Sequence, residues 1–139
     1  MGASYWEYWV SYDDDVNAAL QALRQAVFER GEYSRSGRGR VATIDELIER
    51  NAEDGTHSII DMESVTKDWR PYEADVSPVS DDDLQRLFGT PSPTRPQVEA
   101  SKSDVMGVVE ARPGWTGSYI VTFEDGRPDQ LFFFGISGD

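Results

Sequence analysis

The sequence of 139 residues contains no cysteine and a single histidine, His57. The absence of cysteine excludes disulfide bonds, thiolate nucleophiles and cysteine-ligated zinc or iron–sulfur sites. Any histidine-dependent chemistry must use His57, and motifs that bind zinc through two histidines are absent. The sequence therefore predicts no metal, no cofactor and no catalytic residue.

Basic residues are also scarce. Lys and Arg together number 13 against 26 Asp and Glu, which gives a formal net charge of −13. Such an excess of carboxylates repels phosphates, so nucleic acids and anionic membrane surfaces are excluded as preferred partners. No apolar run approaches the ~20 residues of a membrane span, and the start MGASYWEYW lacks the features of a secretory signal. We expect a cytoplasmic protein whose partner is a basic protein.

Apolar residues are sufficient for a sizeable core. Hydrophobic residues make up 38% of the chain and aromatic residues 12%, with four tryptophans. A disordered chain is poor in these residues, so this one is expected to fold. Its length is typical of one domain, which predicts a single domain over residues 1–139.

Four helices are predicted from apolar spacing and capping residues. The clearest follows the acidic run at residues 13–15 and ends near Arg30, because its apolar residues recur every three or four positions and Gly31 is a natural stop. The other three are predicted to begin after Thr43, after Ser80 and after Thr94, the last running to about Glu110.

Strands are predicted at residues 5–12, 58–65, 118–123 and 129–134. The last two flank Asp125-Gly126, a strong signal for a two-residue hairpin turn. The first carries aromatic rings on both faces, which predicts a central strand, and residues 66–78 are expected to be irregular. The order β-α-α-β-α-α-β-β predicts an α+β fold, with a mixed or mainly antiparallel sheet and helices packed on one face.

The segments YWEYWV, DGTHSIID, LFGTPSPTR and EDGRPDQLFFFGISGD resemble a family of short bacterial proteins. The resemblance covers much of the chain and implies no activity, cofactor or catalytic residue. In composition the chain is similar to the immunity proteins of bacterial toxin systems, which are small, acidic, cysteine-poor α+β domains.

These features favour an acidic protein-binding module, of which an immunity-like or antitoxin-like inhibitor of a basic protein is the most concrete form. Aromatic side chains would anchor the partner and carboxylates would attract it. The candidate partner-binding residues are Trp6, Trp9, Glu53, Asp54, Asp81, Asp82 and Asp83.

Two alternatives stay open. A small enzyme or ligand-binding domain could use a cleft near Asp54, His57 and Asp61, where carboxylates cluster around the single histidine. A homodimer could form if the strand at residues 5–12 or the C-terminal hairpin paired across an interface.

Overall fold

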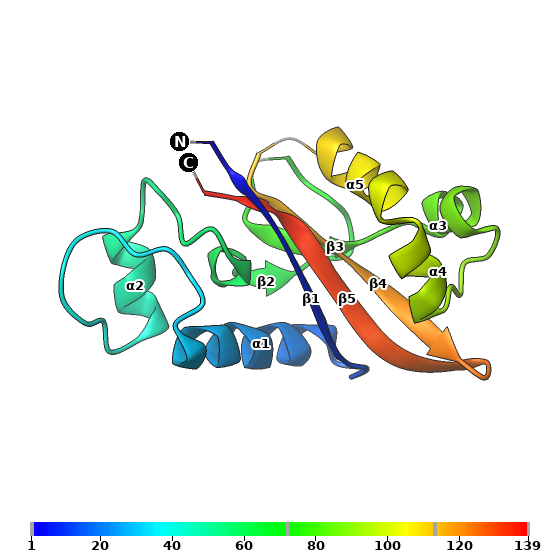
Figure 1. Ribbon diagram of the computed structural model, residues 1–139, viewed down its shortest axis with the longest axis horizontal. Coiled ribbons are helices and arrows are strands. Elements are labelled where there is room, and N and C mark those ends of the chain that lie inside the picture. The colour runs from blue at the N-terminus through cyan, green and yellow to red at the C-terminus, as the bar shows by residue number, and fades with distance from the viewer. Residues whose placement is uncertain (1, 72, 113, 139) are drawn as a thin grey trace.

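The computed structural model describes residues 2–71, 73–112 and 114–138. Within these residues, five strands form one sheet in the order β1-β5-β4-β3-β2. The strands are β1 (Ser4–Ser11), β2 (Ser64–Val65), β3 (Asp75–Pro78), β4 (Thr116–Glu124) and β5 (Arg127–Ser137). β5 pairs antiparallel with both β1 and β4, whereas β4, β3 and β2 run parallel. The α+β class and the mixed sheet are confirmed, and the two termini lie side by side (Figure 1).

The helices are α1 (Val16–Arg30), α2 (Ile44–Arg50), α3 (Asp81–Phe88), α4 (Arg95–Ala100) and α5 (Lys102–Ala111), with a 3₁₀ turn η1 (Ile59–Asp61). The starts of the four predicted helices are confirmed by side-chain caps. The caps are Asp15, Thr43, Ser80 and Thr94, each accepting a hydrogen bond from a backbone N–H of the first turn. No helix of the described chain is both long and apolar enough to cross a bilayer.

The order of elements follows the prediction in outline and differs in three places. The predicted strand at residues 58–65 begins instead with η1 at Ile59–Asp61, because the Ser58 side chain accepts from the Ile60 N–H and turns the chain. Only its last two residues form β2, and the segment expected to be irregular ends in β3. The fourth predicted helix is two helices, α4 and α5, which meet at Ser101.

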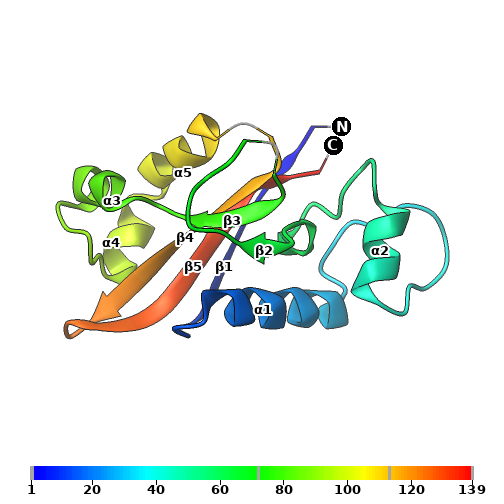
Figure 2. The same ribbon diagram turned by 180° about the vertical axis from the view of Figure 1, so that it is seen from behind.

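The helices lie on both faces of the sheet, not on one as predicted (Figures 1 and 2). The reason is the run Phe132-Phe133-Phe134, in which every residue is fully buried. Successive residues of a strand point to opposite faces, so three consecutive buried rings require cover on both sides. α1 covers Phe133 on one face, and α3, α4 and α5 cover Phe132 and Phe134 on the other.

β1 lies at an edge of the sheet, which corrects the prediction of a central strand. Its rings are covered above and below by the helices, and this produces the two-faced aromatic pattern that suggested a central position. Trp6 and Tyr8 pack in the α1 core, while Tyr5 and Trp9 pack against the opposite one. Cover on both faces therefore does not imply strand neighbours on both sides.

Two glycines make room for the Trp6 ring. A Cβ at Gly135 would lie 2.5 Å from the Thr116 carbonyl oxygen and 2.7 Å from Cη2 of Trp6. At Gly117, a Cβ would lie 3.1 Å from the same ring atom. The indole is 5% exposed, and its Nε1 donates to Ser137 Oγ at 3.0 Å. Trp6 thus fixes β1 onto β5 from inside the core.

We predict that Gly135→Ala lowers the free energy of unfolding by about 1–3 kcal/mol, because the new methyl group overpacks the backbone and Trp6. Urea unfolding followed by tryptophan fluorescence measures this change. The control is Gly107→Ala in α5, where a Cβ meets nothing within 4 Å and the helix should gain roughly 0.5–1 kcal/mol. An unchanged midpoint for Gly135→Ala would contradict the packing described.

Candidate functional site

Helix α1 presents three different stripes to the rest of the molecule. Leu20, Leu23 and Val27 form the central stripe and enter the core below the sheet. Asn17 and Gln21 lie along one flank, and Ala19, Ala22 and Ala26 lie along the other. The two flanks lie close to opposite edges of the sheet. The polar flank hydrogen-bonds to the edge beside it, and the alanine flank does not.

The β2 edge is closed by the polar flank. The Val65 N–H donates to Asn17 Oδ1 at 3.2 Å, and Gln21 Nε2 donates to the Glu63 carbonyl at 2.8 Å. Arg24 continues this flank and donates to the Ile60 carbonyl at 2.9 and 3.3 Å. Side chains of α1 thus take the place of a further strand beside β2, a common way to protect a sheet edge.

The β1 edge is open. The Tyr12 N–H donates to the Asp129 carbonyl at 3.0 Å, and antiparallel hydrogen bonding alternates along a strand, so the even-numbered residues of β1 bond to β5. The backbone groups of Tyr5, Glu7, Trp9 and Ser11 therefore point away from the sheet. Among the described residues, no strand pairs with them and no side chain caps them.

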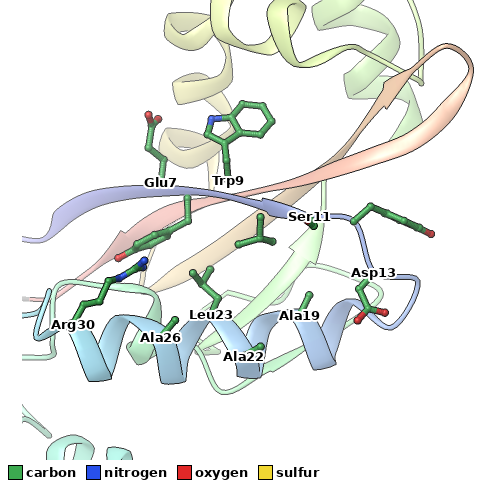
Figure 3. A pocket seen from close by; sticks show the side chains of 12 residues that line it. Glu7, Trp9, Ser11, Asp13, Ala19, Ala22, Leu23, Ala26 and Arg30 are labelled. Atoms are coloured by element: carbon green, nitrogen blue, oxygen red, sulfur yellow. The ribbon is translucent and has the colours of Figure 1, made fainter.

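A groove of about 630 Å³ runs between this open edge and the alanine flank of α1. Figure 3 shows Ala19, Ala22 and Ala26 pointing from α1 toward β1, while Glu7 and Trp9 project from β1 on the side away from α1. Alanine is the shortest side chain that a helix favours, so the wall of the groove stays low. We call this cavity, bounded by β1, the alanine flank, Asp13 and Arg30, the β1 groove.

The charges of the β1 groove differ between its ends. Asp13 lines one end, next to Ser11 and Tyr12, and its Oδ1 accepts from the Asp15 N–H at 2.9 Å. At the other end, Arg30 is matched by Glu32, with 3.4 Å between Nε and Oε1. Glu7 pairs with Lys102 of α5. The carboxylate of Asp13 is thus the group at the groove that has no cation paired with it in the described structure.

Tyr8, Trp9 and Tyr12 are the aromatic residues that line the β1 groove. The Trp9 ring packs at 4.5 Å on Phe132, and the Arg95 guanidinium stacks over it at 4.3 Å. Tyr12 is 37% exposed and is the most exposed large hydrophobic residue among those described. It lines both the β1 groove and a second cleft of about 290 Å³, whose wall includes Asp81 and Tyr119. Tyr12 therefore lies between Asp13 on one side and Asp81 on the other.

The half-buried tyrosines Tyr5, Tyr8 and Tyr119 supply neutral hydroxyls rather than phenolates. Burial raises the pKa of Tyr5, and the hydrogen bond from its hydroxyl to Glu7 Oε2 at 2.8 Å raises it further. Burial also raises the pKa of Tyr8 and of Tyr119. Near neutral pH these groups stay protonated, so they can donate hydrogen bonds and do not act as bases.

The predicted partner-binding residues do not form one surface. Trp6 is in the core, as described above, and Trp9 is half-buried beside the β1 groove. Glu53 and Asp54 follow α2, whereas Asp81, Asp82 and Asp83 begin α3, and these helices lie at opposite ends of the molecule (Figure 1). The structure brings Asp81 close to Tyr12 and Trp9 close to the open edge, and it leaves Glu53 and Asp54 apart from both.

Of the residues of the alternative cleft, His57 and Asp61 hydrogen-bond to residues near the chain termini, and Asp54 does not. The Ser4 hydroxyl and His57 Nδ1 are hydrogen-bonded at 2.8 Å. Asp61 accepts from the Thr56 N–H at 2.7 Å and from the Ser137 hydroxyl at 2.6 Å. Asp54 accepts from the Ser36 hydroxyl at 2.9 Å. The principal clefts of the described chain are lined by other residues, and no three His, Asp or Glu side chains of that part are placed to hold a metal ion.

Comparisons with protein-family models, curated proteins and solved structures gave no match to this chain. The site is therefore interpreted from its own geometry.

Sequence reasoning did not assign Tyr12 or the alanine flank to the site, and it predicted a central strand at residues 5–12, although the homodimer alternative would pair that strand across an interface. A signal for the flank was present, since Ala19, Ala22 and Ala26 recur at helical spacing beside the apolar stripe. Nothing local marks an open edge, because it depends on which strands are neighbours.

We predict that Asp61→Asn lowers the free energy of unfolding by about 1–3 kcal/mol, because the amide leaves the Thr56 N–H or the Ser137 hydroxyl without its acceptor. Asp54→Asn is the matched control and should stay within about 0.5 kcal/mol, since Asp54 is exposed. Chemical denaturation compares the two. Equal stability of both variants would show that Asp61 does not hold the end of β5.

Proposed function

We propose that this chain is a protein-binding module that binds a basic protein through the surface around Tyr12, and that it acts as an inhibitor of the immunity or antitoxin type. The observation that carries the proposal is the position of Tyr12, which is exposed between two clefts whose walls contain Asp13 and Asp81. A cytoplasmic location remains part of this proposal.

The physical basis is an aromatic anchor with carboxylates around it. Tyrosine is enriched among residues that dominate binding energy, because its ring is rigid and its hydroxyl can form a hydrogen bond. Asp13, Asp14 and Asp15 precede α1, and Asp81, Asp82 and Asp83 begin α3, so both acidic runs lie at helix starts near Tyr12. With a net charge of −13, they would accelerate the approach of a basic partner and repel an acidic one.

The alternative cleft at Asp54, His57 and Asp61 receives less support. A catalytic or ligand-binding role requires groups that face a cavity, whereas Asp61 and His57 are hydrogen-bonded to Ser137 and Ser4. Their arrangement is accounted for by joining the two termini to the 56–61 segment.

The proposal predicts that the variant combining Tyr12→Ala, Asp13→Asn and Asp81→Asn captures about tenfold less of its partner than the native protein does. The measurement is affinity capture from native lysate at low salt, with release at high salt and identification by mass spectrometry. Release should follow ionic strength, because salt screens exposed charges beyond ~10 Å at 0.1 M.

The charge-matched control combines Glu53→Gln and Asp54→Asn, which removes two carboxylates at the other end of the molecule. This control should retain the partner. If both variants lose it equally, the net charge and not the Tyr12 surface binds it. Capture that is unchanged by salt and by the triple substitution would refute the proposal.

A further inference from the structure

We infer that the β1 groove accepts an extended, basic segment of the partner, which adds to the sheet as a sixth strand beside β1. This inference rests on the proposed function and specifies how the partner is recognised.

The first argument is the open edge itself. Tyr5, Glu7, Trp9 and Ser11 direct their N–H and C=O groups away from β5, over most of an eight-residue strand. An added strand satisfies such groups in either direction, and strand addition at an exposed edge is a recurrent mode of peptide recognition. At the opposite edge of the sheet, Asn17 and Gln21 hydrogen-bond to backbone groups of Val65 and Glu63. That edge is therefore not free to accept a strand, whereas the β1 edge is.

The second argument is the room beside the edge. A new strand lies about 4.8 Å from β1, and its side chains alternate between the two faces of the sheet. On the α1 side they would meet Ala19, Ala22 and Ala26, which fits apolar side chains of modest size. On the other side they would lie next to Glu7 and Trp9, and the cavity of about 630 Å³ is of the size that ligand sites commonly have.

Charge decides between a basic segment and a second copy of this chain. Two copies of this chain each carry a net charge of −13 and therefore repel one another. A segment with Lys or Arg at alternate positions would instead be attracted by the net charge of the chain and could pair with Asp13, while Arg30 and Lys102 are already paired with Glu32 and Glu7. The occupant we propose therefore alternates basic and apolar residues.

The test uses three synthetic probes of eight residues: (Lys-Val)₄, (Lys-Pro)₄ and (Glu-Val)₄, each with capped ends. (Lys-Val)₄ can form a strand and carries the required charge. (Lys-Pro)₄ has the same charge but lacks half of the N–H groups and resists strand pairing. We expect (Lys-Val)₄ to bind at least tenfold more tightly than either of the others in isothermal titration at low salt.

Residue-resolved amide exchange by NMR provides the second readout. In the free protein, the amides of Glu7, Trp9 and Ser11 should exchange rapidly, while those of Tyr8 and Val10, bonded to β5, should be protected. Binding of (Lys-Val)₄ should slow the first group by at least tenfold. This alternation along one strand is specific to strand addition, since general electrostatic binding would not select odd-numbered residues.

Two substitutions test the edge and the groove separately. Ser11→Pro removes an outward N–H without removing a bond to β5, and Ser11→Ala is its control. Ala22→Met fills the groove from an exposed position of α1, and Ala18→Met, exposed on the same helix outside the groove, is its control. We expect Ser11→Pro and Ala22→Met each to weaken (Lys-Val)₄ at least tenfold, with both controls within twofold. If Ser11→Pro fails to fold, the Ala22 and Ala18 pair decides.

The contradicting outcomes are distinct. Equal, salt-sensitive binding of (Lys-Val)₄ and (Lys-Pro)₄ without protection of odd-numbered amides would overturn strand addition and leave the acidic binding surface intact. Protection of the same amides at high protein concentration without peptide, with a dimer mass, would assign the edge to a second copy and overturn the inference. Failure of all three probes, together with failed partner capture, would overturn the proposed function as well.

Discussion

The burial of β5 between two cores is the constraint on which the rest of the structure depends. Phe132, Phe133 and Phe134 are fully buried, so β5 must have helices on both faces, and in the sheet it also has a strand on each side. β4 supplies one side through the tight turn at Asp125 and Gly126, whose φ angles of 52° and 76° fit a two-residue hairpin. β1 supplies the other side from the far end of the chain. Because β5 is the strand with which β1 pairs in the described chain, the pairing that completes the core also leaves the second edge of β1 open.

Helix α1 then determines what each edge of the sheet can do. Its central stripe is fixed by the Phe133 side of the core, and that sets the directions of its two flanks. Asn17 and Gln21 consequently reach the β2 edge with amide groups that hydrogen-bond to its backbone, while the alanines border the β1 edge with methyl groups, which have no donor or acceptor. One helix thus closes one edge and borders a groove at the other. The difference lies in side-chain length and polarity, not in the backbone.

The parts of the fold that could be predicted from the sequence are those set by local chemistry. The caps at Thr43 and Thr94 and the Asp125-Gly126 turn need only neighbouring residues, and each was found where it was predicted. The failures concern distant partners. β3 is a strand because it pairs with β4 on one side and with β2 on the other. Its own sequence, which ends in Pro78, does not predict a strand. Likewise, the prediction of Trp6 as a surface anchor was wrong. The Trp6 ring is buried against Gly117 and Gly135, which are more than 100 residues away in the chain, so the local sequence does not indicate its burial.

An open edge strand carries a risk of aggregation, because its unpaired backbone groups can pair with another copy. The acidity of this chain opposes that outcome. Each copy carries a net charge of −13, so two copies repel one another as they approach edge to edge. The same repulsion does not act on a basic strand, for which the acidic residues are attractive. In the proposed binding mode, the excess of acidic residues prevents the open edge from pairing with a second copy. The open edge in turn provides a specific binding site for a basic strand.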